Sequence, residues 1–252
     1  MRSYAIGDIH GQLGQLHEAH HLIALDRART GDETAPVIHL GDLVDRGPDS
    51  AGVIDRLMQA QADDDRVIVL KGNHDNLFSL FLDDPQARDP RLRARFSWLH
   101  PDVGGGATLT SYGVHAPADR PLAGVHADAL RAVPDAHRHW LAALPDHHRH
   151  GDAFFAHAGI RPGIALHLQD PADLLWIRHD FLDDGRDHGA LIVHGHTSVS
   201  EATHCGNRLN LDSGAAWGRQ LTAAVIEGRD AFALTPRGRV PLPPSSPRER
   251  DR

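Results

Sequence analysis

The chain has 252 residues, a formal net charge of −8 and a single cysteine. One cysteine excludes an internal disulfide framework and fits a reducing cytoplasm. The negative charge argues against a duplex nucleic-acid binder, which needs a basic surface for the phosphate backbone. The apolar fraction of 40% is ordinary, and we expect neither a membrane span nor a signal peptide. Together these features predict one soluble, cytoplasmic domain without a membrane partner.

Five short segments place an Asp, Asn or His beside a glycine. In chain order they read GDIHG, GDLVDRG, GNHD, HAG and GHT, at residues 7–11, 41–47, 72–75, 157–159 and 195–197. Apolar runs precede all five, and helical patterns follow the first three. The polar residues are therefore expected just beyond the carboxyl ends of strands, where open α/β sheets place ligands. Carboxylate, amide and imidazole groups without thiolate suit a pair of hard or borderline divalent ions. The pattern predicts a two-metal hydrolytic site.

A single motif of this kind is usually only a turn whose Asp or Asn caps the next helix. Five in this order resemble the phosphoprotein phosphatase branch of the calcineurin-like metallophosphoesterases, in particular its bacterial and phage-type Ser/Thr protein phosphatases. The resemblance covers roughly residues 3–235. It implies an α/β fold, an αββα sandwich of two mixed β-sheets flanked by helices. It also implies hydrolysis of phosphate monoesters by direct attack of a hydroxide that bridges two metal ions.

The resemblance further implies a set of metal ligands. These are Asp8, His10, Asp42, Asn73, His157 and His196. The first three would hold one metal, and Asp42 would bridge to a second metal that the last three complete. Two divalent ions are expected, with Mn²⁺ favoured and Fe or Zn left open, because oxygen and nitrogen ligands accept all of them. Such a pair clamps a phosphate through two of its oxygens.

Four further residues are implied to act on the substrate. His74 would be the general acid that protonates the leaving alkoxide, and Asp45 would fix the tautomer of His74. Arg46 and Arg178 would bind phosphate oxygens through their forked guanidinium groups. Only a short Trp-Ile-Arg sequence supports Arg178, so a structural salt bridge remains an alternative for that residue.

The chain departs from the family pattern at two places. Asp75 stands where many members have Glu, and this shorter carboxylate could still orient the backbone of the third motif. The eukaryotic SAPNYC signature is absent, and residues 210–218 resemble the bacterial form, which is expected to wall the site. Cys205 is expected in a turn between strands rather than as a nucleophile, because no phosphate-binding cradle follows it.

Residues from about 83 to 150 contain seven prolines and several short helical patterns. We predict that they form a mostly helical cap over the strand ends, inserted in one catalytic domain at residues 1–235. Within the cap, residues 104–113 resemble the family segment GG.TL.SYG, which either borders the substrate cleft or forms a structural turn. Residues 220–226 and 230–234 are predicted to be the last strands. The Pro- and Arg-rich residues 236–252 are predicted to be a disordered tail.

Three functions are compatible with these motifs. The favoured one is a metal-dependent phosphomonoesterase of Ser/Thr protein phosphatase type, acting on a phosphorylated protein or a small phosphomonoester. The second keeps the site but uses a dinucleoside polyphosphate or another nucleotide. VDRGP and GHT favour the first, because bacterial diadenosine tetraphosphatases tend to have VARGP and GHW. The third, a non-catalytic phosphopeptide-binding protein, is disfavoured because every implied ligand and the His74/Asp45 pair are present.

Overall fold

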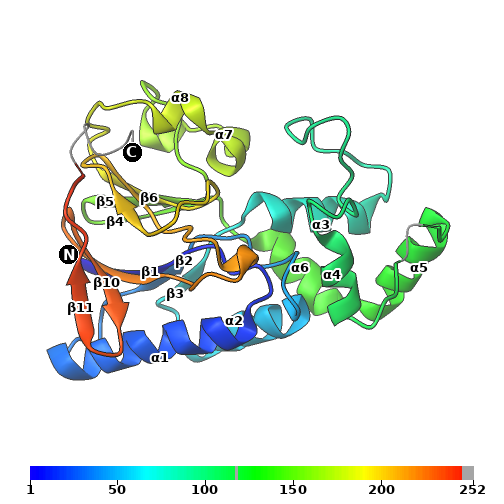
Figure 1. Ribbon diagram of the computed structural model, residues 1–252, viewed down its shortest axis with the longest axis horizontal. Helices are drawn as coiled ribbons and strands as arrows, with labels where there is room; N and C mark the ends of the chain where they lie inside the picture. The colour runs from blue at the N-terminus through cyan, green and yellow to red at the C-terminus, as the bar shows by residue number, and fades with distance from the viewer. Residues whose placement is uncertain (117–118, 246–252) are drawn as a thin grey trace.

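Two stacked β-sheets form the centre of the structure, a computed structural model that describes residues 1–116 and 119–245 (Figure 1). The strands of the first sheet are β1 (Arg2–Ile6), β2 (Val37–His39), β3 (Val67–Val69), β9 (Ala223–Glu227), β10 (Asp230–Thr235) and β11 (Gly238–Pro241). Those of the second are β4 (His147–His150), β5 (Ala153–Ala156), β6 (Leu191–His194), β7 (Thr203–His204) and β8 (Arg208–Asn210).

Each sheet combines parallel and antiparallel strand pairs. The order is β11-β10-β9-β1-β2-β3 in the first sheet and β4-β5-β6-β8-β7 in the second. In the first sheet β1, β2 and β3 run parallel, while β9 pairs antiparallel with β1. In the second, β5, β6 and β8 run parallel, with antiparallel β4 and β7 at the edges. Both sheets are therefore mixed, as the sequence predicts.

Helices flank the two sheets, on their outer faces and at one end (Figure 1). They are α1 (Leu13–Thr30), α2 (Ser50–Asp63), α3 (Asn73–Asp83), α4 (Gly105–Ser111), α5 (Leu122–Ala132), α6 (Asp135–Ala143), α7 (Pro171–Trp176) and α8 (His179–Leu182), with short 3₁₀ turns at Leu166–Leu168 and Ala215–Trp217. Figure 1 shows α1 and α2 along the first sheet and α7 and α8 above the second. No helix in the described part of the chain is both long and apolar enough to cross a bilayer.

Alternate side chains of the central strands enter different hydrophobic cores. In β1, Tyr4 and Ile6 pack with the helices of the first sheet, whereas Ala5 joins the core between the sheets. In β5, Phe155 faces the other sheet, and Phe154 packs with residues of α7 and α8. Strands buried on both faces have continuous apolar sequences. This layering confirms the predicted αββα sandwich.

The predicted helical cap is present and shares a core with the sandwich. Helices α4, α5 and α6 lie at one end of the sheets beside α3 (Figure 1), and α3 packs against α5 and α6. Trp98, Leu109 and Leu141 belong to the same hydrophobic cluster as the helix-facing side chains of β1. The cap ends at about residue 146 rather than 150, because His147–His150 forms β4 and pairs with β5.

The expectation of a disordered tail from residue 236 is wrong for its first part. Gly238–Pro241 forms β11, antiparallel to β10. Arg239 makes ion pairs with buried Asp26 at 2.7 Å and with Glu227 at 2.9 Å. Backbone hydrogen bonds and ion pairs stabilise this strand. Its sequence therefore lacks the apolar pattern from which a strand would be predicted. The predicted tail residues 246–252 lie outside the described residues.

Candidate metal centre and active site

The strand ends bring all six predicted metal ligands to one site. Asp8 and His10 follow β1, Asp42 follows β2 and Asn73 follows β3. His157 and His196 follow β5 and β6 of the second sheet. Each of the six residues is at most 8% exposed. The site is therefore built on rigid elements, at the edge where the parallel strands of both sheets end.

Asp42 occupies the centre of this group. Its Oδ2 lies 3.4 Å from His10 Nε2, and its Oδ1 lies 3.4 Å from His157 Nε2. Two sets of side chains have ligand atoms close enough to share an ion, namely His10 with Asp42 and His74, and Asp42 with His157 and His196. Asp42 is common to both sets, which is the position a bridging carboxylate would need.

The remaining two predicted ligands connect to this centre directly. Asn73 Oδ1 lies 2.9 Å from His157 Nε2 and 2.8 Å from His196 Nδ1. Asp8 Oδ2 accepts a hydrogen bond of 2.9 Å from the backbone N–H of His196. This contact joins the loop after β1 in the first sheet to the loop after β6 in the second.

Backbone carbonyls fix the orientation of two imidazoles. His10 Nδ1 donates to Val44 O at 2.8 Å, and His157 Nδ1 donates to Leu40 O at 2.9 Å. A ring nitrogen that donates in this way leaves the other nitrogen as a lone-pair ligand. Both Nε2 atoms therefore face Asp42 in the form that binds a metal.

The charges and unpaired atoms of the site fit divalent cations. Burial, reinforced by repulsion from Asp212 and Asp42, raises the pKa of Asp8 well above its usual range. Burial opposes ionisation of Asp42 as well, but His157, His74 and His10 hold the pKa of that carboxyl well below its usual range. Asp8 Oδ1 and His196 Nε2 are buried without a hydrogen-bond partner. Cations coordinated here would relieve the carboxylate repulsion and satisfy unpaired ligand atoms.

Backbone strain is concentrated in the same loops. Among the described residues, positive φ angles at non-glycine positions occur at His10, Asp42, Asp45, Arg46 and His196. Such conformations cost about 1–3 kcal/mol each and persist only where the surroundings enforce them. The motif glycines allow neighbouring loops to pack closely enough to hold these conformations. A Cβ at Gly195 would lie 1.9 Å from Asp8 Oδ1, and one at Gly72 would lie 2.3 Å from Asp42 Oδ1.

The proposed acid and its orienting carboxylate form a buried pair. His74 Nδ1 lies 2.6 Å from Asp45 Oδ2, and Asp45 is fully buried.

Asp75, the residue that departs from the family pattern, accepts hydrogen bonds from the backbone of Leu43 and Gly72 at 2.9 and 2.8 Å. Its carboxylate thereby ties the second motif to the third.

Both predicted phosphate-binding arginines line one cleft. The cleft has a volume of about 630 Å³ and includes Arg46, Asn73, His74 and Arg178 among its lining residues. Arg46 Nη1 and Nη2 donate to His10 Nε2 and His74 Nε2 at 2.8 and 2.9 Å. Arg178 Nη1 donates to Thr197 Oγ1 at 3.0 Å. Within the described residues no carboxylate pairs with Arg178, so the salt-bridge alternative has no support.

Sequence reasoning assigned no individual role to several side chains at this site, although residues 210–218 were expected to wall it. Asp212, which follows β8, adds a buried carboxylate that interacts electrostatically with Asp8 and Asp42. Its signal was available, because it too is an Asp near a glycine beyond a strand. Trp217 places its ring 5.0 Å from Arg46 Cζ. Trp98 and Thr108 of the cap donate hydrogen bonds to Asp45, and no local pattern marks Trp98.

Comparison with known proteins agrees with this geometry. Residues 1–212 match the family model of the calcineurin-like phosphoesterases. The asymmetrical bis(5'-nucleosyl)-tetraphosphatase PrpE of Anoxybacillus flavithermus is 25% identical over 241 residues, covering 86% of this chain and 87% of the relative. A crystal structure provisionally described as a diadenosine tetraphosphatase has a TM-score of 0.62 and 21% identity, covering 95% of this chain and 93% of that one.

A second solved structure extends the likeness of fold. The cold-active protein-tyrosine phosphatase of the psychrophile Shewanella sp. has a TM-score of 0.58 and 18% identity, covering 96% of this chain and 80% of that one. With the family match, these observations identify the chain as a member of the calcineurin-like phosphoesterase family. It is a hydrolase that acts on phosphoester bonds.

Proposed function

We propose that this chain is a dinuclear metal-dependent phosphomonoesterase of Ser/Thr protein phosphatase type. Asp8, His10 and Asp42 would hold the first metal ion, and Asp42 would also contact the second. Asn73, His157 and His196 would complete the second site. Two divalent ions, which we infer to be Mn²⁺, would supply positive charge for the phosphate and lower the pKa of water.

The residues that line the cleft have separate roles in this proposal. Arg46 and Arg178 bind the free phosphate oxygens and hold the ester in one orientation, as forked guanidinium groups do. Arg46 leaves its contact with His74 Nε2 when phosphate enters, so that this nitrogen faces the ester oxygen. With Arg46 away, Nε2 takes up a proton from solvent, and Asp45 stabilises the resulting imidazolium through Nδ1. His74 then donates the Nε2 proton to the leaving oxygen and returns to its neutral form.

The His74–Asp45 pair, joined at 2.6 Å, is the observation that carries the choice of substrate. A serine or threonine alkoxide is a poor leaving group and needs a proton as the ester bond breaks. A nucleotide leaving group is already a stable anion and gains little from such an acid. A buried, pre-oriented acid therefore favours an alkyl phosphate monoester.

A dinucleoside polyphosphate is the second candidate, and two observations favour it. One is the PrpE relative, whose name describes asymmetrical cleavage of bis(5'-nucleosyl) tetraphosphates. The other is that the cleft also contains Arg91 and Arg93, together with the aromatic side chains of Phe96 and Trp176. Additional phosphates could pair with the arginines, and a base could stack on an aromatic ring.

A side-by-side turnover assay tests the two candidates. The Mn²⁺-loaded protein is given a phosphoserine peptide, a phosphotyrosine peptide, diadenosine tetraphosphate or a cyclic dinucleotide, and kcat/KM is measured for each. The proposal expects the highest value for the phosphoserine peptide. A clear preference for diadenosine tetraphosphate would transfer the assignment to the second candidate. Arg93→Ala should then lower kcat/KM for that nucleotide while leaving phosphoserine turnover near the wild-type value.

A further inference from the structure

Two side chains from the cap contact the carboxylate of Asp45. Trp98 Nε1 donates to Oδ2 and Oδ1 at 3.0 and 3.1 Å. Thr108 Oγ1 donates to Oδ1 at 2.7 Å. With the contact from His74 to Oδ2 at 2.6 Å, three side chains share one carboxylate. Trp98 and Thr108 are at most 6% exposed, and Asp45 is fully buried.

We propose that Trp98 and Thr108 are positioning residues for the reaction. They hold the Asp45 carboxylate in one rotation, so that Oδ2 stays aligned with His74 Nδ1 while His74 Nε2 faces the leaving group. The inference rests on the proposed function, because it takes His74 as the general acid. By this inference the cap supports proton transfer to the leaving group, in addition to any contact that it makes with the substrate.

The carboxylate needs these donors because it is buried. A carboxylate away from water loses its hydration, and each unpaired oxygen lone pair then costs free energy. Rotation about the terminal bond of an Asp side chain is soft, so His74 alone would leave the second oxygen free to turn. Thr108 holds Oδ1 and Trp98 spans both oxygens, which removes that freedom.

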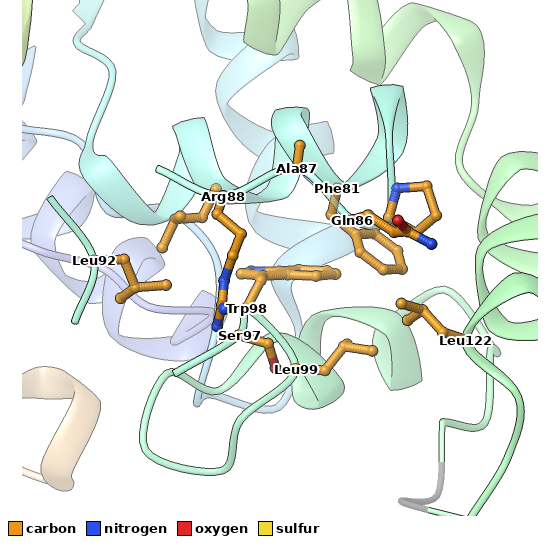
Figure 2. A pocket seen from close by; sticks show the side chains of 11 residues that line it. Phe81, Gln86, Ala87, Arg88, Leu92, Ser97, Trp98, Leu99 and Leu122 are labelled. Carbon is orange, nitrogen blue, oxygen red and sulfur yellow. The ribbon is translucent and has the colours of Figure 1, made fainter. Parts of the chain in front are cut away.

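The indole of Trp98 is itself firmly held. Its ring stacks on Phe78 at a centroid distance of 5.1 Å and lies 4.6 Å from the ring of Phe81. A Cβ added at Gly105 would lie only 2.4 Å from Trp98 Cε2, so the N-terminus of α4 lies directly against the indole. Figure 2 shows Trp98 in the wall of a cap cavity of about 240 Å³, with Phe81 and Leu99 nearby. Packing thus fixes the direction of the Nε1–H bond.

Thr108 holds the backbone of Asp45 as well as its side chain. Its Oγ1 accepts a hydrogen bond of 2.8 Å from the Asp45 N–H and lies 3.2 Å from Ser50 Oγ. Asp45 has a φ of 74°, a conformation that needs external support in a residue with a side chain. The GG.TL.SYG segment therefore acts behind the catalytic pair and does not border the cleft at this position.

Matched variants separate positioning from packing. Thr108→Val removes the hydroxyl at nearly constant shape, and Thr108→Ser keeps it. Trp98→Phe removes the indole N–H, and Leu99→Ala alters the same cavity wall without touching Asp45. Each protein is assayed with a phosphoserine peptide and with p-nitrophenyl phosphate, whose aryl leaving group needs little protonation. Metal content is measured in parallel.

If Asp45 is no longer aligned with His74, kcat should fall for the phosphoserine peptide but not for p-nitrophenyl phosphate. Thr108→Val and Trp98→Phe should each lower kcat for phosphoserine about tenfold, the effect expected for one hydrogen bond to a charged group. For p-nitrophenyl phosphate the change should stay below about twofold. KM and metal content should not change, and Thr108→Ser and Leu99→Ala should remain close to wild type. In a His74→Asn background, Thr108→Val should cause no further loss, because the two residues act through one step.

Equal losses on both esters, or additive losses with His74→Asn, would overturn the inference. If wild-type protein hydrolyses no phosphomonoester, the proposed function fails. The contact between Trp98 and Asp45 is then tested separately, by hydrogen exchange of the Trp98 indole N–H. In ¹⁵N-labelled protein, the Trp98 indole N–H should exchange far more slowly than that of Trp217, which is 62% exposed. Asp45→Asn should shift the Trp98 resonance. An unshifted or rapidly exchanging Trp98 indole would show that the contact with Asp45 does not hold.

Discussion

The strand-end loops and the cap contribute to the same cleft by different physical means. The loops supply buried carboxylates and imidazoles on a strained backbone, such as Asp42 and His196 with positive φ. The cap supplies the exposed Arg93 and the buried support of Trp98 and Thr108. The loops are fixed by the ends of two sheets, whereas the cap is joined to them by side-chain contacts and by a backbone hydrogen bond from Arg46 N–H to Gly104 O. Changes in the loops should therefore abolish activity, and changes at the cap should give graded effects.

The largest effect is expected at the centre of the loops. Asp42→Asn keeps the shape of the side chain but removes the negative charge shared by both proposed metal sites. Metal content, measured by elemental analysis, and turnover of all substrates should fall together to background. Asp83→Asn, at an exposed position at the end of α3, is the control and should change neither. Full activity in metal-free Asp42→Asn protein would end the two-metal proposal.

The next effect separates the acid from the ligands. His74→Asn should keep both metals, because Asp8 rather than His74 is the proposed third ligand of the first ion, although the His74 ring lies close to His10 and Asp42. It should lower kcat for a phosphoserine peptide by about 10²–10⁴-fold, the usual contribution of a general acid. The loss with p-nitrophenyl phosphate should be much smaller because its leaving group needs less protonation. If both substrates suffer equally, His74 is not the acid.

Arg178 should have an intermediate effect that depends on the substrate. Arg178→Ala should lower kcat/KM for phosphoserine about 10- to 100-fold, as expected when one charged hydrogen-bonding group is lost. A diester such as bis-p-nitrophenyl phosphate offers one fewer free oxygen and should be affected less. Arg95→Ala removes a cation from the cap that does not line the cleft, and should leave both rates unchanged. Equal losses on the two esters would contradict a clamp on a terminal phosphate.

The smallest effect is expected where cap and loops meet. A Cβ at Gly104 would lie 2.6 Å from Arg46 Cγ, and Gly104 has a φ of +99°. Gly104→Ala should therefore lower the free energy of unfolding by about 1–3 kcal/mol and displace Arg46. Gly106 lies within α4 with open space at its Cβ position, so Gly106→Ala should be neutral or slightly stabilising. Thermal unfolding compares the two, and equal Tm values would show that the junction tolerates a side chain.

Much of the fold and ligand set could be predicted because the signals are local. Each motif follows an apolar strand and carries its own glycine, as Gly41 precedes Asp42 and Gly195 precedes His196. These glycines permit the close backbone approaches seen in the structure. The strand β11 was missed for the opposite reason. Arg239 binds Asp26 across 213 residues of sequence, and no local pattern reports such a pair.

The family, the αββα layering and the six side chains that gather at the strand ends could all be predicted from the sequence motifs. Local backbone conformation and strand periodicity encode those features within a few residues of each motif. The contact of Trp98 with Asp45, 53 residues earlier in the chain, could be seen only in the folded protein, as could the electrostatic interaction of Asp212 with Asp8 and Asp42. Such contacts depend on how the cap and β8 pack against the loops. Packing brings together residues that are far apart in the sequence, and no periodic pattern in the sequence marks them.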